Sequence, residues 1–392
     1  MANVDTDKLS AVEYDQFDGV LALSSALEAG LKVDLYPRQV LICANDAGQS
    51  LSFVHGLPAT SGLAPVTFAQ DKRMRRSMME RLGFPVPKGA TFSLGHGVTL
   101  AKKFARTIGY PVSVKPAIGD NGIEAFVGLT GASGIDKALS YLSQPTYIRD
   151  EFSRAAYGLT ELREPGYDDE GNLTVPPGYM FLLEKHPIGR YVRFLVIDGK
   201  VVSAIDCNGI PSTGGFTKGF RVLEDLDPQT IDLVSRAAKV IPGLDVVSMD
   251  LIIPNLSAPL REQEVFIVEF SERPGLWLQH KVDVSLAFEM GREILATYAA
   301  NEQVVVPPSN ETRQGTLHIH ALPDAEGSVK AISQSAKNHG IEFSVAEVDQ
   351  LAGSMEAQIK AQAIDIALFM NALLGGEVDG IPAMRSKFVA SN

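Results

Sequence analysis

The stretch VVSMDLIIPNLSAPLREQEVFIVEFSERPGL, residues 246–276, contains two apolar runs joined by a polar segment. The runs at residues 246–253 and 265–270 are typical of β-strands, and each carries one acid, Asp250 and Glu269. A short polar connection between two such runs favours an antiparallel hairpin. This stretch therefore predicts two neighbouring strands with one carboxylate on each.

The two acids also indicate a divalent-metal site. If the hairpin closes Pro254 against Val265, antiparallel counting puts Asp250 directly opposite Glu269. Cβ atoms of opposed residues lie ~5 Å apart, and like charges there are destabilising. A Mg²⁺ ion relieves that repulsion and prefers one or two carboxylates together with nucleotide phosphates. On this geometry alone, a solvent-facing strand pair with both acids in water remains an equal alternative.

A lysine at the end of another strand is a candidate phosphate ligand. In PVSVK, residues 111–115, the two valines share one face and Lys115 points to the other. The loop that follows contains Gly119 and Gly122, and glycines let backbone N–H groups approach phosphate oxygens closely. The alternative is a strand that merely ends in a lysine and a tight turn.

Three further segments carry cations or a hydroxyl that are candidates for the same site. The turn SERPGL brings Ser271 and Arg273 close behind Glu269, unless it is an ordinary loop. A tight Asp-Gly turn at 198–199 predicts a hairpin whose first strand carries Arg193. The glycine-rich loop STGGFTKGF, residues 212–220, suits a lid and carries Lys218, with Arg221 next to it. A surface loop without function is the alternative.

The rest of the chain predicts a mixture of helices and strands, which is the α+β (mixed α/β) class. Asp71 is a plausible N-cap for a helix that stops at Gly83. We expect its apolar stripe to consist of four residues at helical spacing: Met74, Met78, Met79 and Leu82.

Composition changes and turn-rich stretches divide the chain into three expected domains. A first block covers residues 1–70, a central domain covers 71–302 with a phosphate-loop subdomain at about 111–190, and a C-terminal α/β domain covers 303–392. The last domain has no catalytic motif, so a structural or oligomerising role is its default. Its predicted elements are a strand at 316–322 and helices at 329–338 and 364–374.

Composition narrows the class of protein. The 392-residue chain has a net charge of −12, which disfavours binding to nucleic acid or to an anionic membrane. Cys43 and Cys207 show no metal-binding or disulfide spacing, and the polar N-terminus MANVDTDKLS is no signal peptide. No apolar run reaches the ~20 residues that cross a bilayer. A cytoplasmic protein is expected.

The order of these motifs resembles the ATP-grasp superfamily, and in particular the ATP-grasp part of cyanophycin synthetases. The resemblance covers residues 60 to about 297 and implies an ATP-grasp fold with a small N-terminal block and an extra C-terminal domain. Five segments carry it: TSGLAPVTFAQDKRMRRSMMERLGFPVPKG, GYPVSVKPAIGDNG, EKHPIGRYVRFLVIDGKVVSA, DLII and VEFSERPGL.

The resemblance also implies roles for individual residues. It assigns the ATP phosphates to Lys72, Lys115, Gly119 and Gly122, and the adenine to Glu184 and Lys185. It assigns Mg²⁺ to Asp250, Glu269 and Ser271, and cations near the reacting groups to Arg193, Lys218, Arg221 and Arg273. Two departures stand out: Ser271 replaces a frequent Asn, and Tyr191 replaces an acid that binds ribose in many relatives.

The implied activity is that of an ATP-dependent carboxylate–amine ligase that uses Mg²⁺. A carboxylate attacks the γ-phosphate to give an acyl phosphate and ADP, and an amine then displaces phosphate. Amino acids or short peptides are the expected substrates, and a homodimer is the expected assembly. Two alternatives remain: a nucleotide-binding regulatory or scaffold protein without turnover, and a ligase with a non-amine acceptor.

Overall fold

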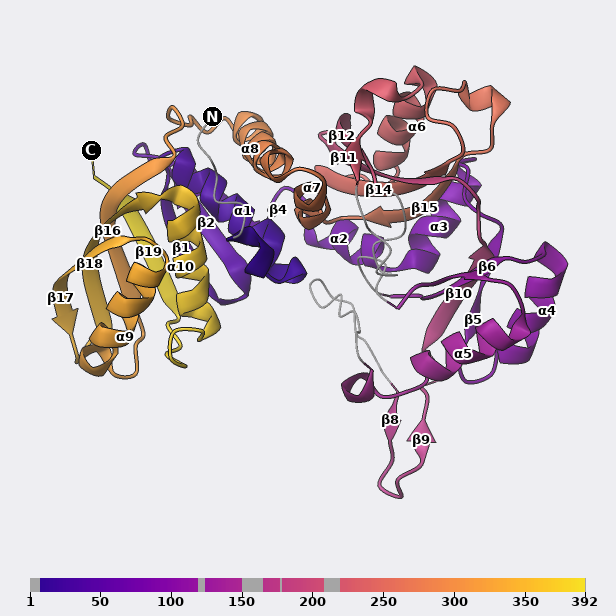
Figure 1. Ribbon diagram of the computed structural model, residues 1–392, viewed down its shortest axis with the longest axis horizontal. Coiled ribbons are helices and arrows are strands. Elements are labelled where there is room, and N and C mark those ends of the chain that lie inside the picture. The colour runs from indigo at the N-terminus through magenta and orange to yellow at the C-terminus, as the bar shows by residue number, and fades with distance from the viewer. Residues whose placement is uncertain (1–7, 119–123, 150–164, 177, 208–218, 392) are drawn as a thin grey trace. The chain divides into compact units, whose positions relative to one another are not determined.

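The computed structural model describes residues 8–118, 124–149, 165–176, 178–207 and 219–391 (Figure 1). Its contacts form two compact units. Unit 1 combines the chain up to Thr60 with the chain from Pro274 onward, and unit 2 is Ser61–Arg273. Within the described ranges, no helix combines the length and apolarity needed to cross a membrane.

Unit 1 is built on one eight-stranded sheet in the order β17-β18-β16-β19-β1-β2-β3-β4. Its central pair joins distant parts of the chain, because β1 runs antiparallel to β19 with Val33 opposite Phe388. The strands are β1 Lys32–Tyr36, β2 Val40–Ala44, β3 Ser50–Val54, β4 Leu57–Pro58, β16 Thr312–His320, β17 Glu342–Asp349, β18 Ser354–Gln362 and β19 Arg385–Ala390. The helices are α1 Tyr14–Glu28, α7 Leu276–Val282, α8 Val284–Asn301, α9 Ala325–Asn338 and α10 Ala363–Gly375.

The sheet of unit 1 draws on both the first and the third block expected from sequence. The predicted strand at 316–322 and helices at 329–338 and 364–374 correspond to β16, α9 and α10. The proposed domain boundaries stay predictions, because the contacts group the chain by unit rather than by those blocks.

Unit 2 contains two antiparallel sheets and a small hairpin of β8 (Gly166–Tyr167) with β9 (Leu173–Thr174). The four-stranded sheet has the order β5-β10-β6-β7, and the five-stranded sheet β13-β12-β11-β14-β15. The first sheet consists of β5 Gly89–Ser93, β6 Val112–Pro116, β7 Phe126–Leu129 and β10 Met180–Lys185. The second consists of β11 Arg190–Ile197, β12 Lys200–Asp206, β13 Phe220–Arg221, β14 Val246–Ile253 and β15 Phe266–Ser271.

The helices of unit 2 cover its sheets and complete two apolar cores. Helices α4 (Val98–Ile108) and α5 (Ala132–Leu142) pack on the four-stranded sheet, and α6 (Pro228–Ala238) packs on the five-stranded sheet. Two more helices, α2 (Leu63–Gln70) and α3 (Lys72–Arg81), follow one another in the chain. The α+β class expected from sequence is confirmed.

The hairpin predicted at the Asp198-Gly199 turn is formed by β11 and β12. Both turn residues have positive φ, 49° and 72°, the left-handed pair that a two-residue hairpin turn requires. The turn sequence thus fixes the register of the strand that carries Arg193.

The pairing of Asp250 with Glu269 is also confirmed, although the hairpin does not close as assumed. Ile252 pairs with Phe266 instead of Ile267, so the register near the turn differs by one residue. A bulge at Val268 then restores the count and brings Asp250 opposite Glu269. The expected closing register was wrong because an inserted residue cannot be read from alternation alone.

The apolar stripe expected on α3 is wrong for two of its members. Met74 is 46% exposed and Leu82 is 59% exposed, whereas Lys72 and Arg75 are buried together with Met79. The helix therefore turns a face with two cations inward. Its N-cap is as predicted, since the Asp71 side chain accepts a hydrogen bond from the backbone N–H of Arg73.

Candidate functional site

One row of paired residues crosses all five strands of the second sheet of unit 2. Arg221 pairs with Ile205, Ile205 with Arg193, Arg193 with Asp250, and Asp250 with Glu269. Directly paired residues point to the same side of a sheet. The opposite side carries the apolar core that includes Phe194, Met249 and Phe270. The row therefore places the candidate residues of four strands on one largely polar face.

Asp250 is held by two side chains of β11. Arg193 donates from Nε and Nη2 to the two carboxylate oxygens at 2.6 and 2.8 Å, and the Tyr191 hydroxyl also donates to Asp250. Burial on its own lowers the pKa of Arg193, but the charge of Asp250 outweighs it and the net pKa is raised. Burial and the same carboxylate raise the pKa of Tyr191. Both groups thus stay protonated, and Asp250 is a carboxylate with fixed orientation.

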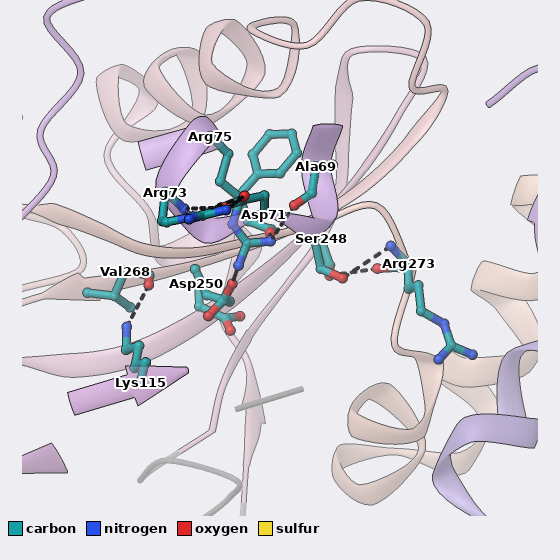
Figure 2. A network of polar contacts seen from close by, with 12 residues as sticks. Ala69, Asp71, Arg73, Arg75, Lys115, Ser248, Asp250, Val268 and Arg273 are labelled. Atoms are coloured by element: carbon teal, nitrogen blue, oxygen red, sulfur yellow. Dashed lines mark hydrogen bonds and ion pairs between the residues drawn. The ribbon is translucent and has the colours of Figure 1, made fainter. Parts of the chain in front are cut away.

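Glu269 is held from α3. Arg75 forms an ion pair with Glu269, donates to the Ala69 carbonyl at 2.9 Å, and also donates to the Phe270 carbonyl. Figure 2 shows the contact of Arg75 with the Ala69 carbonyl. A guanidinium therefore neutralises each member of the facing carboxylate pair.

Lys115 links the two sheets of unit 2. Its Nζ donates to Glu184 Oε1 at 2.6 Å on the neighbouring strand and to the Val268 carbonyl at 2.9 Å on β15 (Figure 2). Val268 is the bulged residue, so the bulge directs its carbonyl toward the lysine. The alternation that predicted Lys115 on the face opposite Val112 and Val114 is matched, because the two valines lie in the apolar core and Lys115 makes polar contacts.

Two cavities meet at Lys115, Glu184, Val268 and Glu269. The first, which we call the cationic pocket, is lined by the cations Lys72, Arg75, Arg76 and Lys115. The second we call the apolar pocket. Beyond the shared residues, the apolar pocket is lined by Ser113, Ala125, Val127, His186, Pro187, Tyr191 and Ile252.

Three other predicted residues point elsewhere or have internal partners. Lys185 Nζ donates to the carbonyls of Gly109 and Tyr110, at 3.1 and 2.7 Å, and lines neither pocket. The Ser271 hydroxyl accepts from the backbone N–H of Arg273 at 3.2 Å. Figure 2 shows the Arg273 side chain extending away from Asp250.

Of the remaining candidates, Arg221 lies exposed on the edge strand, in line with Asp250 but separated from it by the two strands β12 and β11. Gly119, Gly122 and Lys218 lie outside the described residues.

The donors available for Mg²⁺ are the two facing carboxylates. Within the described ranges, no group of three or more His, Cys, Asp or Glu side chains is arranged to hold a metal ion. Mg²⁺ commonly uses one or two carboxylates and takes further ligands from nucleotide phosphates and water. Asp250 and Glu269 fit a metal that is shared with a nucleotide, and do not form a complete site alone.

Arg75 was missed in the sequence, although a signal for it was present. It lies three residues after Lys72, and residues three apart share a helix face. Once Lys72 is expected to face a ligand, Arg75 is expected to face it as well.

The stability of the chain should depend on pH through His186 at the edge of the apolar pocket. Its Nδ1 lies 3.1 Å from Ser113 Oγ, and burial, followed by the charge of Lys115, lowers its pKa. Below pH ~6.5 the unfolded chain takes up a proton that the folded chain resists. The free energy of unfolding should therefore fall as the pH drops from 7.5 to 5.5.

Urea unfolding at several pH values measures this dependence. His186→Asn should give a shallower decline than the unmodified chain, because His280 and His320, whose pKa values are also lowered mainly by burial, remain. If the free energy of unfolding declines equally with falling pH in the two chains, His186 does not contribute to the pH dependence.

The chain is similar to cyanophycin synthetases. It is 22% identical over 291 residues to that of Crocosphaera subtropica, which covers 64% of this chain and 32% of the relative. It is 25% identical over 260 residues to that of Synechocystis sp., which covers 56% of this chain and 29% of the relative. The chain thus spans about a third of the length of the curated relatives it matches. No protein-family model matches the sequence. The resemblance found in the motif order is confirmed.

Three solved structures are similar to part of this chain. A D-alanine–D-alanine ligase from Bacillus anthracis has a TM-score of 0.41 at 11% identity and covers 61% of this chain and 69% of that one. A bifunctional glutathione synthetase from Pasteurella multocida has a TM-score of 0.37 at 12% identity, covering 65% and 40%. The ATP-grasp ligase PsnB, complexed with a minimal precursor, Mg and ADP, has a TM-score of 0.38 at 14% identity, covering 59% and 60%.

Proposed function

We propose that this chain is an ATP-dependent ligase that joins a carboxylate to an amine and releases ADP and phosphate. One observation carries the proposal: a cationic pocket and an apolar pocket adjoin at Lys115 and Glu269. A nucleotide has the same division, with a flat apolar base at one end and charged phosphates at the other. The similarity to cyanophycin synthetases supports a ligase.

In this proposal the base occupies the apolar pocket. Val127, Pro187 and Ile252 offer apolar surface to the base there. The phosphates occupy the cationic pocket, where Lys72 and Lys115 supply positive charge from a helix and a strand. Glu184 holds Lys115 in place for this role.

The proposed reaction has two steps. A carboxylate oxygen attacks the γ-phosphorus, the bond between that phosphorus and the ADP oxygen breaks, and ADP leaves. An amine nitrogen then attacks the acyl carbon, the carbon–phosphate bond breaks, phosphate leaves, and the nitrogen loses a proton. The cations of the pocket position the phosphates and neutralise charge on the transferred group. A bound Mg²⁺, held by Asp250 and Glu269, would supply further charge neutralisation.

The substrates we propose are an amino acid or a short peptide as carboxylate, and an amino acid as amine. The similarity to cyanophycin synthetases supports this substrate class, and it covers about a third of their length. We further propose a cytoplasmic homodimer, and gel filtration with light scattering tests the dimer directly.

ADP formation from Mg·ATP is the direct test. The purified chain should release ADP and phosphate only when an amino acid or peptide supplies the carboxylate, and product should appear only with an amine. A panel of single amino acids, then pairs, with a coupled phosphate readout, identifies both substrates. Product mass should equal the sum of the two substrates less one water.

The same panel separates the alternatives. A regulatory or scaffold protein would bind nucleotide and release no ADP with any pool; the internal hydrogen bond of Ser271 favours this candidate. A ligase with a non-amine acceptor would release ADP with the carboxylate, and hydroxylamine would trap the acyl phosphate without any amine yielding product.

A further inference from the structure

A third cation of the cationic pocket has a role that the sequence motifs do not assign. Arg75 is 6% exposed, on the inward face of α3, one turn after Lys72. Its guanidinium contacts one carboxylate and two backbone carbonyls, those of Glu269, Phe270 and Ala69. Arg75 is thus bound to the carboxylate of Glu269, which a metal ion shared with the nucleotide would need as a ligand.

Each member of the carboxylate pair already has a cationic partner without a metal. The cations Lys72, Arg75, Lys115 and Arg193 stand against the carboxylates Glu184, Asp250 and Glu269, and all of these residues are buried except Glu269, whose side chain is 11% exposed. A divalent ion that entered alone would add two positive charges to a cluster in which the cations already outnumber the carboxylates by one. A nucleotide brings several negative charges, and its phosphate oxygens match the planar fork of a guanidinium.

We propose that Arg75 is a phosphate-binding residue that is stored on Glu269 while no nucleotide is bound. When the phosphates enter, the guanidinium moves from Glu269 to a phosphate oxygen, and the freed carboxylate accepts the metal ion that arrives with the nucleotide. Metal alone is excluded from the site. This inference rests on the proposed function and adds the order in which ligands bind.

The unmodified chain gives the first test, with Mn²⁺ as the spectroscopic probe for the metal. Titration followed by electron paramagnetic resonance should show no saturable Mn²⁺ site without nucleotide, and one site with a non-hydrolysable ATP analogue. Mn²⁺ binding of equal strength in both conditions, abolished by Glu269→Gln, would overturn the proposal. No Mn²⁺ site in either condition would instead count against the proposed Mg·ATP chemistry.

The Arg75→Met variant gives two effects of opposite sign. Affinity for the nucleotide analogue without metal should fall about tenfold to a hundredfold, because a charged hydrogen bond to phosphate is lost. Affinity for Mn²⁺ alone should rise at least about tenfold, because Glu269 loses its counter-ion. A residue with a purely structural role would lower both affinities when removed.

Two matched variants complete the experiment. Arg81→Met removes an exposed cation from the same helix and should change neither affinity. Arg75→Lys keeps the charge and should leave Mn²⁺ excluded while it weakens nucleotide binding less than methionine does. If Arg75→Met does not fold, the lysine variant and the unmodified chain still decide the matter; strong Mn²⁺ binding to either without nucleotide contradicts it.

Discussion

Replacing Glu269 with glutamine lowers the rate of ADP formation by at least about a hundredfold, the size of effect that removal of one charge-stabilising group has in other enzymes. The amide keeps the shape of the side chain and its place opposite Asp250. It loses the negative charge that a divalent ion requires. The measurement is the coupled ADP assay with the amino acids that stimulate the unmodified chain.

Glu264→Gln is the matched control, because Glu264 is exposed just before the same strand. It should retain full activity. Circular dichroism and thermal melting establish that both variants are folded. An active Glu269→Gln variant, within a few-fold of the unmodified chain, would remove Glu269 from the metal assignment and leave Asp250 to carry it.

Replacing Arg193 with methionine should lower the free energy of unfolding by about 3–5 kcal/mol, the cost of leaving one partner of a buried ion pair uncompensated. Arg193 is 2% exposed and Asp250 is 1% exposed, so neither charge can turn to water. Two hydrogen bonds to the carboxylate disappear with the guanidinium. Urea unfolding measures the change.

An exposed ion pair of unit 2 supplies the control. Arg236 is paired with Asp232 one helical turn away, and 58% and 64% of the two side chains are exposed, so Arg236→Met should cost less than about 1 kcal/mol. Adding Asp250→Leu to Arg193→Met should recover part of the lost stability, because no charge then remains unpaired. An Arg193→Met chain as stable as Arg236→Met would show that water reaches Asp250.

The sequence predicted the facing acids well, since alternation determines which side of a strand a residue takes. It did not predict what the acids contact. The repulsion between Asp250 and Glu269 indicated a metal ion, yet Arg193 and Arg75 relieve it within the chain. Arg193 lies on a strand whose pairing with β14 spans more than fifty residues, and no local pattern encodes that pairing.

The inward face of α3 shows a different limit. Hydrophobic periodicity assigned Met74 and Leu82 to the core, because apolar stripes normally face inward. Here a charged pocket lies on that side: Lys72 and Arg75 line it, and Glu269 and two backbone carbonyls compensate the charge of Arg75. Periodicity fails where the interior is itself polar.

The pairing of β1 with β19 bears on how the chain acquires its structure during synthesis. Unit 2 interrupts unit 1, so a growing polypeptide has all of Ser61–Arg273 available before β16 and β19 have been made. The first four strands, β1 to β4, must wait with the β1 edge unpaired for β19, because Val33 pairs with Phe388, 388 − 33 = 355 residues later. Closing so long a loop is slow, and open strand edges favour association between chains. Unit 2 is therefore expected to fold first. The folding of unit 1 is expected to limit the rate at which the whole chain reaches its native state.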